Sequence, residues 1–224
     1  LIEKYSISTV FCEEPFLKND IELYKKIEKL LNFYNVKLNS YNSTLLCEPY
    51  SILKDDMSPY RVFTPFYKKG YIKYFSPKAP LGAPLNIEYR NIDNPTVIED
   101  LNLLDNFNWH DKLDLTWDIS ESSALAIFDS FKEKSIYSYK KGRDYPNSKS
   151  NSRLSPYIRF GMISLDRIWY ELDSLQIDSN IEHFKSEIGW REFSYYLLYH
   201  FPHMETSNLQ IKFDKFDWEN SKNK

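Results

Sequence analysis

A proline-rich stretch without hydrophobic periodicity divides this chain of 224 residues into two parts. Its apolar residues follow neither a helical nor a strand repeat. Prolines and glycines interrupt it at Pro77, Pro80, Gly82, Pro84 and Pro95. Such a composition is typical of an extended connection between folded units. We therefore expect two units, residues 1–76 and 120–224, joined by a connector at 77–119.

The first part carries the pattern of a parallel α/β layer. Residues 8–12 are β-branched and apolar, which predicts a strand, and residues 19–35 show helical spacing of apolar side chains after good N-cap types. Residues 43–47 form a second strand candidate, and strand, helix, strand in this order predicts a βαβ unit. A further helix is expected around Pro65, because proline suits the first turn of a helix.

The second part is predicted to be helical. Ser120 or Glu121 begins one periodic segment, Ser164 is placed to cap a second, and the longest spans residues 180–200. The expected fold class is therefore α/β followed by all-α.

Composition narrows the function classes. Apolar residues make up 42% and charged residues 27%, with a net charge of −3, which fits a folded protein that does not coat nucleic acid by bulk charge. No apolar run approaches the ~20 residues that a membrane span needs. The chain starts without Met, a basic start or an apolar leader, so we expect a cytoplasmic piece of a longer protein. The sequence carries no sign of its oligomeric state, and a monomer is the default expectation.

Several common sites are missing from the sequence. It has no Walker loop, no GxSxG elbow and no GxGxxG fingerprint, which argues against ordinary nucleotide hydrolysis, esterase and Rossmann dinucleotide functions. Pro202 interrupts the helix between His200 and His203, so that pair lacks the i, i+4 geometry of a helical metal site. We expect no metal.

A polar, glycine-containing loop at 139–146 is followed by the segment 151–161, in which Pro156 is placed to open a helix. Hydroxyls, an arginine and the unpaired N–H groups of a helix start favour a phosphate there. The alternative is that Ser152 or Ser155 is only an N-cap. The pattern alone leaves both interpretations open.

A second cluster lies on the longest helix, where Glu187, Trp190 and Arg191 stand at i, i+3 and i+4. One interpretation is a pocket wall whose indole stacks on a planar base while the charged groups bind its polar edge or phosphate. The other is a Glu187–Arg191 surface pair beside a core tryptophan. Spacing does not distinguish them.

Four segments in this order resemble the DNA photolyases and cryptochromes, and within them the class I cyclobutane pyrimidine dimer photolyases. They are Tyr-Arg-Val-Phe-Thr-Pro-Phe at 60–66, Gly-Arg-Asp-Tyr-Pro at 142–146, Ser-Arg-Leu-Ser-Pro-Tyr-Ile-Arg-Phe-Gly at 152–161 and Glu-Ile-Gly-Trp-Arg-Glu-Phe at 187–193. The resemblance implies the last part of a Rossmann-like antenna domain, a long connector and the first part of a helical FAD-binding domain. A fragment of this extent is expected to be inactive alone and to hold FAD weakly.

The resemblance also implies site residues. FAD contacts would come from Tyr139, Asn151, Ser152, Arg153, Leu154, Ser155 and Phe184, the last standing where some relatives have tryptophan. DNA contacts would come from Arg143, Glu187, Trp190 and Arg191, with Glu187 and Trp190 facing the flipped dimer as catalytic residues. A folate or deazaflavin antenna is a further implied cofactor.

The implied function is light-dependent repair of cyclobutane pyrimidine dimers, in which photoexcited reduced FAD passes an electron to a dimer flipped out of the DNA stack. The rival within the family is a cryptochrome, a blue-light receptor without repair. Trp190 and Glu187 favour repair, because plant-type receptors usually lose the tryptophan and animal-type members usually carry glutamine instead of the glutamate. An inactive remnant is a second rival.

Overall fold

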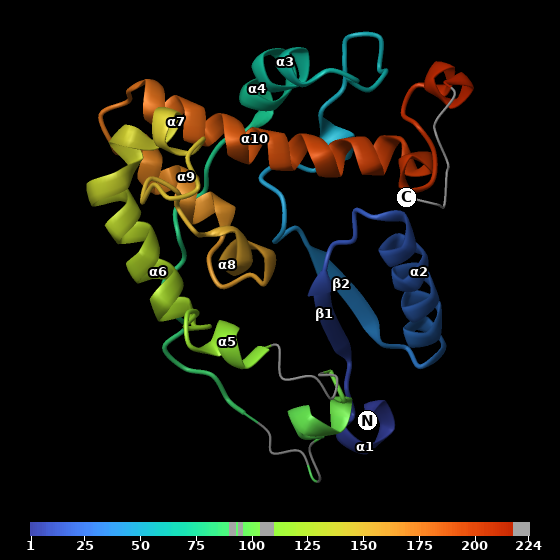
Figure 1. Cartoon of the computed structure of the whole chain (residues 1–224). Coiled ribbons are helices and arrows are strands. Elements are labelled where there is room, and N and C mark those ends of the chain that lie inside the picture. Colours follow the sequence, from blue (N-terminus) through green and yellow to red (C-terminus); the bar gives the residue numbers. More distant parts are fainter. Residues whose placement is uncertain (90–92, 94–95, 104–109, 217–224) are drawn as a thin grey trace, which may run out of the picture.

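The computed structural model describes residues 1–89, 93, 96–103 and 110–216. The long helix α10 (Ser179–His200) runs across the molecule. Figure 1 shows α3 and α4 on one side of it, the two strands with α2 on the other, and α6 to α9 gathered at its N-terminal end. The α/β part and the helical part therefore meet along α10, and the predicted order of α/β followed by helices is confirmed.

The α/β part is a single βαβ unit. Strand β1 (Thr9–Glu13) leads into α2 (Lys18–Phe33), which returns the chain to β2 (Lys37–Tyr41). The strands pair in parallel with Thr9 opposite Lys37 and Glu13 opposite Tyr41. The first strand and the helix lie where the apolar patterns predict them. No side chain caps α2, although Asn19 and Asp20 looked suited to it.

The second strand was predicted wrongly at residues 43–47. These residues form no strand, and yet Leu45 and Cys47 are buried. Their segment packs against α10, where the Glu192 carboxylate accepts the Leu46 N–H at 2.9 Å and the Cys47 N–H at 3.4 Å. A side-chain carboxylate thus replaces the neighbouring strand as hydrogen-bond acceptor.

The helix predicted around Pro65 is confirmed, but it is not regular. It consists of α3 (Phe63–Pro65), a π-helical turn at Phe66–Tyr71 and α4 (Ile72–Tyr74). A π-helical turn shifts the side chains that follow it around the axis. The rings of Phe63, Tyr67, Tyr71 and Phe75 stack successively along this segment, with centroids 5.3–5.7 Å apart.

The helical part follows the predicted pattern closely. Helix α6 (Glu121–Ser130) begins after Ser120, whose hydroxyl accepts the Ser123 N–H. Helix α9 (Leu165–Asp173) begins after Ser164, whose hydroxyl accepts the Arg167 N–H. Between them lie a π-helical turn at Phe131–Ser135, a 3-10 turn at Ile136–Ser138, α7 (Tyr139–Gly142) and α8 (Ser155–Arg159).

The remaining elements are short helical turns. Two of them, at Ile98–Leu101 and α5 (Asp111–Asp114), lie inside the predicted connector, so that segment is not wholly extended. Pro95 lies outside the described residues, and the connector's limits at 77 and 119 stay predictions. The others are α1 (Ile2–Tyr5) and 3-10 turns at Pro49–Ser51, Pro202–Glu205 and Ile211–Lys215.

Residues from both parts share one core. Ile52, Phe66 and Tyr71 from the first part pack with Ile181, Phe193 and Tyr196 of α10 and with α6 and α9. The buried Tyr196 hydroxyl accepts the Tyr60 N–H at 2.9 Å and donates to the Ile52 carbonyl at 2.8 Å. One side chain of α10 thus completes the backbone hydrogen bonding of the irregular segment before α3.

Replacing Tyr196 with phenylalanine is expected to lower the free energy of unfolding by about 1–3 kcal/mol, because it leaves a buried N–H and a buried carbonyl without their partner. Chemical denaturation measures this loss. Tyr199→Phe on the same helix is the control, since Tyr199 is only partly buried. Equal stability of the Tyr196 variant and the wild type would contradict the assigned bridge.

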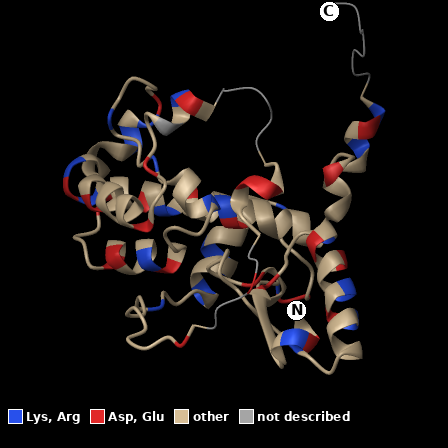
Figure 2. Ribbon diagram, turned by 90° about the horizontal axis from the view of Figure 1, so that it is seen from below, with Lys and Arg blue, Asp and Glu red and all other residues tan. Residues whose placement is uncertain are grey.

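Charge is mixed over the surface. Lys and Arg segments lie interspersed with Asp and Glu segments over the ribbon (Figure 2), consistent with the net charge of −3. Among the described residues, no helix is long and apolar enough to cross a bilayer.

Candidate functional site

Three polar side chains meet on the first half of α10. Glu187 forms an ion pair with Arg143, which follows α7, and the Arg143 Nη1 lies 3.4 Å from the His183 Nε2. His183 precedes Glu187 by one turn, with 3.8 Å between its Nε2 and the Glu187 Oε1. The Glu187 and Arg143 side chains keep 29% and 30% of their surface exposed, so water or a ligand reaches both.

The electrostatics of this cluster favour charged groups. Burial lowers the pKa of Arg143, but the hydrogen bond and the charge of Glu187, together with the charges of Tyr139 and Asp144, outweigh burial and leave the pKa above its ordinary value. Tyr139 lies under the guanidinium, with 5.9 Å from its ring centroid to the Arg143 Cζ. Burial raises the pKa of Tyr139, so its phenol stays protonated. An exposed carboxylate held by a guanidinium suits recognition of an N–H donor.

Trp190 is next to this cluster, one turn beyond Glu187, and it is not a core residue. Its side chain is 46% exposed. Phe63 of α3 stacks on the indole with 3.7 Å between ring centroids and 12° between planes, and Phe193 meets the indole edge-on at 6.1 Å. Phe63 thus covers one face of the indole, and the opposite face is the one left open to solvent.

Arg191 does not join Glu187. Its Nη1 donates to the Thr44 carbonyl at 2.8 Å and to the Glu192 Oε1 at 3.1 Å, and its guanidinium lies over Tyr195. The Glu187–Arg191 surface pair considered as an alternative is therefore absent. The structure does not bring Arg191 together with Arg143 and Glu187, and its contact with DNA stays a prediction.

Two of the predicted flavin contacts are core residues. Tyr139 and Phe184 meet edge-on at 5.0 Å, and Phe131 packs against both. Each is less than a tenth exposed. Tyr139 is also the member of this ring cluster next to the polar groups, since its ring centroid lies 5.9 Å from the Arg143 Cζ and 6.2 Å from the His183 ring centroid.

The predicted phosphate segment 151–155 leads into α8. Asn151, Arg153 and Ser155 are exposed, whereas Leu154 is buried and offers only its backbone. Arg153 has a positive φ of 55°, an unusual conformation for a side-chain-bearing residue, and its guanidinium lies 4.5 Å from the Trp117 ring centroid. The N-cap of α8 is Leu154.

The interpretation of Ser152 or Ser155 as the N-cap is therefore wrong. No side chain caps α8, and Ser152 Oγ accepts the Leu154 N–H at 3.4 Å. Close packing joins the segment to α7: a Cβ on Gly142 would lie 2.2 Å from the Ser150 Oγ, and Ser150 Oγ is 3.0 Å from Ser138 Oγ. The exposed amide, hydroxyl and guanidinium groups are donors suited to a phosphate.

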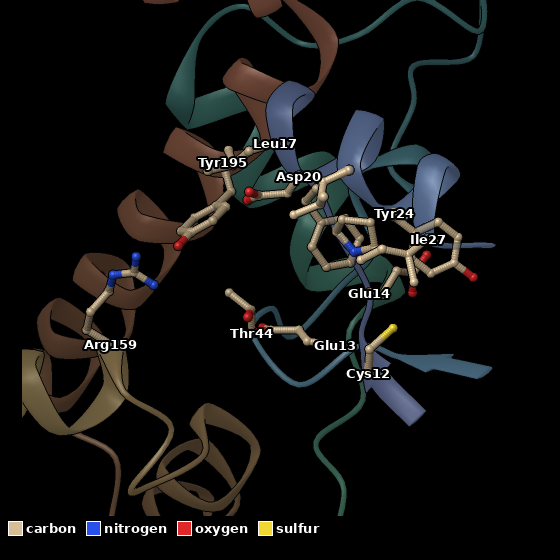
Figure 3. A pocket seen from close by; sticks show the side chains of 13 residues that line it. Cys12, Glu13, Glu14, Leu17, Asp20, Tyr24, Ile27, Thr44, Arg159 and Tyr195 are labelled. Atoms are coloured by element: carbon tan, nitrogen blue, oxygen red, sulfur yellow. The ribbon is translucent and has the colours of Figure 1, made fainter. Parts of the chain in front are cut away.

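A separate cavity of about 330 Å³ lies between the α/β part and the helical part. Figure 3 shows Arg159 and Tyr195 on one wall, facing Glu13, Asp20 and Thr44 on the other. The cavity lies beyond the carboxyl ends of β1 and β2, where open parallel sheets bind ligands. Cys12 lines it and is partly exposed, whereas Cys47 is buried.

Sequence reasoning missed two members of the site. His183 was given no role in the sequence analysis, although its i, i+4 spacing to Glu187 places the two on one helix face. Phe63 was quoted within the motif at 60–66 without a role. Within the described ranges, no group of three or more His, Cys, Asp or Glu side chains is placed to hold a metal ion.

Comparisons with known proteins decide the family. A family profile described as DNA photolyase matches residues 1–84. The deoxyribodipyrimidine photo-lyase of Agrobacterium fabrum is 30% identical over 97% of this chain and 46% of its own length. The crystal structure of a class III photolyase from Agrobacterium tumefaciens superposes with a TM-score of 0.81 at 27% identity, covering 99% of this chain and 47% of that one.

The chain belongs to the DNA photolyase family. A second photolyase-family relative, the deoxyribodipyrimidine photo-lyase of Alkalihalophilus pseudofirmus, is 30% identical over 82% of this chain and 38% of its own length. The chain spans about half or less of the length of these relatives. The matches do not support class I in particular, since a class III photolyase is among the similar structures.

Proposed function

We propose that this chain is part of a light-dependent enzyme that repairs cyclobutane pyrimidine dimers in DNA. The observation that carries the proposal is the half-exposed indole of Trp190 one turn from the Glu187–Arg143 pair, in a chain whose relatives bear the name deoxyribodipyrimidine photo-lyase. An indole provides a stacking surface for an unstacked base, and the carboxylate accepts its N–H groups.

The roles of the polar groups follow from their contacts. Arg143 holds the Glu187 carboxylate in place through their ion pair, and it is itself exposed enough to reach a phosphate. Glu187 would accept an N–H of one base of the flipped dimer and so hold that base in the orientation in which it reacts. Trp190 would exclude water from the other side of the base by stacking.

The residues present fit FAD as the cofactor. Exposed Asn151, Arg153 and Ser155 would hold its phosphates at the start of α8, with Ser152 and the Leu154 backbone beside them, and Tyr139 and Phe184 would border its rings. When bound and reduced, FAD would supply the electron that splits the cyclobutane ring after absorbing blue light. The donor set, rather than any enclosed cavity, supports this assignment.

The test uses the complete gene product. It is reduced, bound to an oligonucleotide carrying one cyclobutane thymine dimer and illuminated with blue light, and the restored thymines are counted against a dark control. Light-dependent restoration is the expected result. Flavin absorbance without restoration would indicate a cryptochrome-type receptor, and a protein that binds no flavin would overturn the FAD assignments.

We further propose that the cavity between the two parts holds a second, light-harvesting chromophore. Its walls offer the guanidinium of Arg159 and the phenol of Tyr195 opposite the carboxylates of Glu13 and Asp20, which suits a ring system with both acidic and amine-like edges. Folate and deazaflavin meet this description. Arg159→Ala is expected to lower the amount of a non-FAD chromophore that co-purifies, measured by absorbance after extraction, while the FAD content stays unchanged.

A further inference from the structure

The covered face of Trp190 has a defined partner. Phe63 comes from the first part of the chain, and its ring lies almost parallel to the indole at 3.7 Å. Rings at this separation are in van der Waals contact over much of their faces. Phe193 contacts the indole only at its edge. Phe63 therefore sets which face of Trp190 is available to a ligand.

Phe63 is itself held from behind. Tyr67 stacks on it at 5.3 Å and 22°, one turn further along the same helical segment. Tyr67 lies directly on the backbone of α10 at Gly189, where an added Cβ would come within 2.5 Å of two ring carbons of Tyr67 and 3.6 Å from Phe63. The glycine next to Trp190 thus lets two aromatic rings pack against the helix.

We propose that Phe63 is a positioning residue for Trp190. Backed by Tyr67 on Gly189, it holds the indole so that only the outer face is free, and that face receives one base of the flipped pyrimidine dimer. The inference rests on the proposed function. It adds that part of the recognition of damaged DNA comes from a ring in the α3 segment that does not touch the base.

The chain offers a matched control. Phe75 is also a partly buried phenylalanine and stacks at the other end of the same aromatic series, against Tyr71 at 5.5 Å, but it does not contact Trp190. Phe63→Leu and Phe75→Leu both remove an aromatic ring while keeping an apolar side chain. A loss due merely to weaker packing would affect the two variants alike.

The first readout is affinity in the dark for a dimer-containing oligonucleotide, relative to the undamaged one. Phe63→Leu is expected to lower this preference roughly three- to tenfold, the worth of one aromatic pair, while Phe75→Leu leaves it unchanged. In a Trp190→Ala background, Phe63→Leu should cause no further loss, because the two rings act as a unit. Additive losses, or equal losses in Phe63→Leu and Phe75→Leu, would overturn the proposal.

The second readout needs no DNA, and it separates the positioning role of Phe63 from the proposed repair function. Fluorotryptophan incorporation gives a ¹⁹F resonance for Trp190, assigned by its disappearance in Trp190→Phe. That resonance should move in Phe63→Leu and stay in place in Phe75→Leu. If it moves while the wild type shows no preference for damaged DNA, the positioning stands and the repair function fails. If it does not move, the positioning inference is wrong whatever the DNA result.

Discussion

Glu192→Ala is expected to lower the free energy of unfolding by about 2–5 kcal/mol, the cost of leaving two buried backbone N–H groups without their acceptor. The Glu192 carboxylate is 3% exposed and accepts the Arg191 guanidinium together with the Leu46 and Cys47 N–H groups. Alanine would leave two backbone donors without an acceptor. Chemical denaturation of the wild type and variant measures the difference, with Glu182→Ala, an exposed carboxylate on the same helix, as control.

The same residue makes stability depend on pH in a defined direction. Burial raises the pKa of Glu192 from 4.5 to about 7 in spite of Arg191 and the two N–H donors. The folded state therefore binds this proton more tightly than the unfolded state, and its contribution to stability is lost as pH rises between about 4.5 and 7.

Glu192→Gln should remove that part of the pH dependence, because the amide does not titrate. The neighbouring groups do not interfere in this window, since burial raises the pKa of Cys47 to about 12 and that of Tyr71 well above its ordinary value. The measurement is the difference in unfolding free energy between wild type and Glu192→Gln at pH 5 and pH 7. A difference that stays constant would contradict the buried-acid assignment.

Glu187→Ala is expected to reduce repair per absorbed photon roughly tenfold, the worth of one hydrogen bond to a charged group. Binding should fall much less, because the variant also releases Arg143 from its ion pair and leaves it free to contact a phosphate. Repair yield and dark affinity are measured on the same dimer-containing oligonucleotide.

Glu182→Ala again serves as the control and should leave both quantities unchanged. The Glu187 assignment predicts a gap between the two losses. If yield and affinity decline by equal factors, Glu187 acts only in binding, and its role during ring opening is wrong.

Local patterns were enough to predict much of the fold. Ser120 and Ser164 cap helices as expected, and the strand at residues 9–13 and helix α10 follow from their apolar spacing. The prediction of a second strand at residues 43–47 was wrong because Leu45 and Cys47 are buried against α10 rather than against a neighbouring strand. The observed strand β2 contains Lys37, Asn39 and Ser40, polar residues that do not predict a strand.

The site was predictable only where its members share one helix. Glu187 and Trp190 were placed together by their i, i+3 spacing. The Arg143 ion pair and the Phe63 stack join residues that lie far apart in sequence, and no local pattern encodes such contacts. The resemblance to the family supplied Arg143 as a DNA contact, but not its pairing with the carboxylate.

Helix α10 carries both Glu187 and Tyr195 without interruption. An α-helix rises about 1.5 Å per residue, so these two side chains start about 12 Å apart along the axis. The helix therefore fixes the spacing between the proposed repair site and the cavity proposed for the second chromophore. A pigment resting on Tyr195 would therefore keep a constant spacing from Glu187, because no loop lies between the two residues.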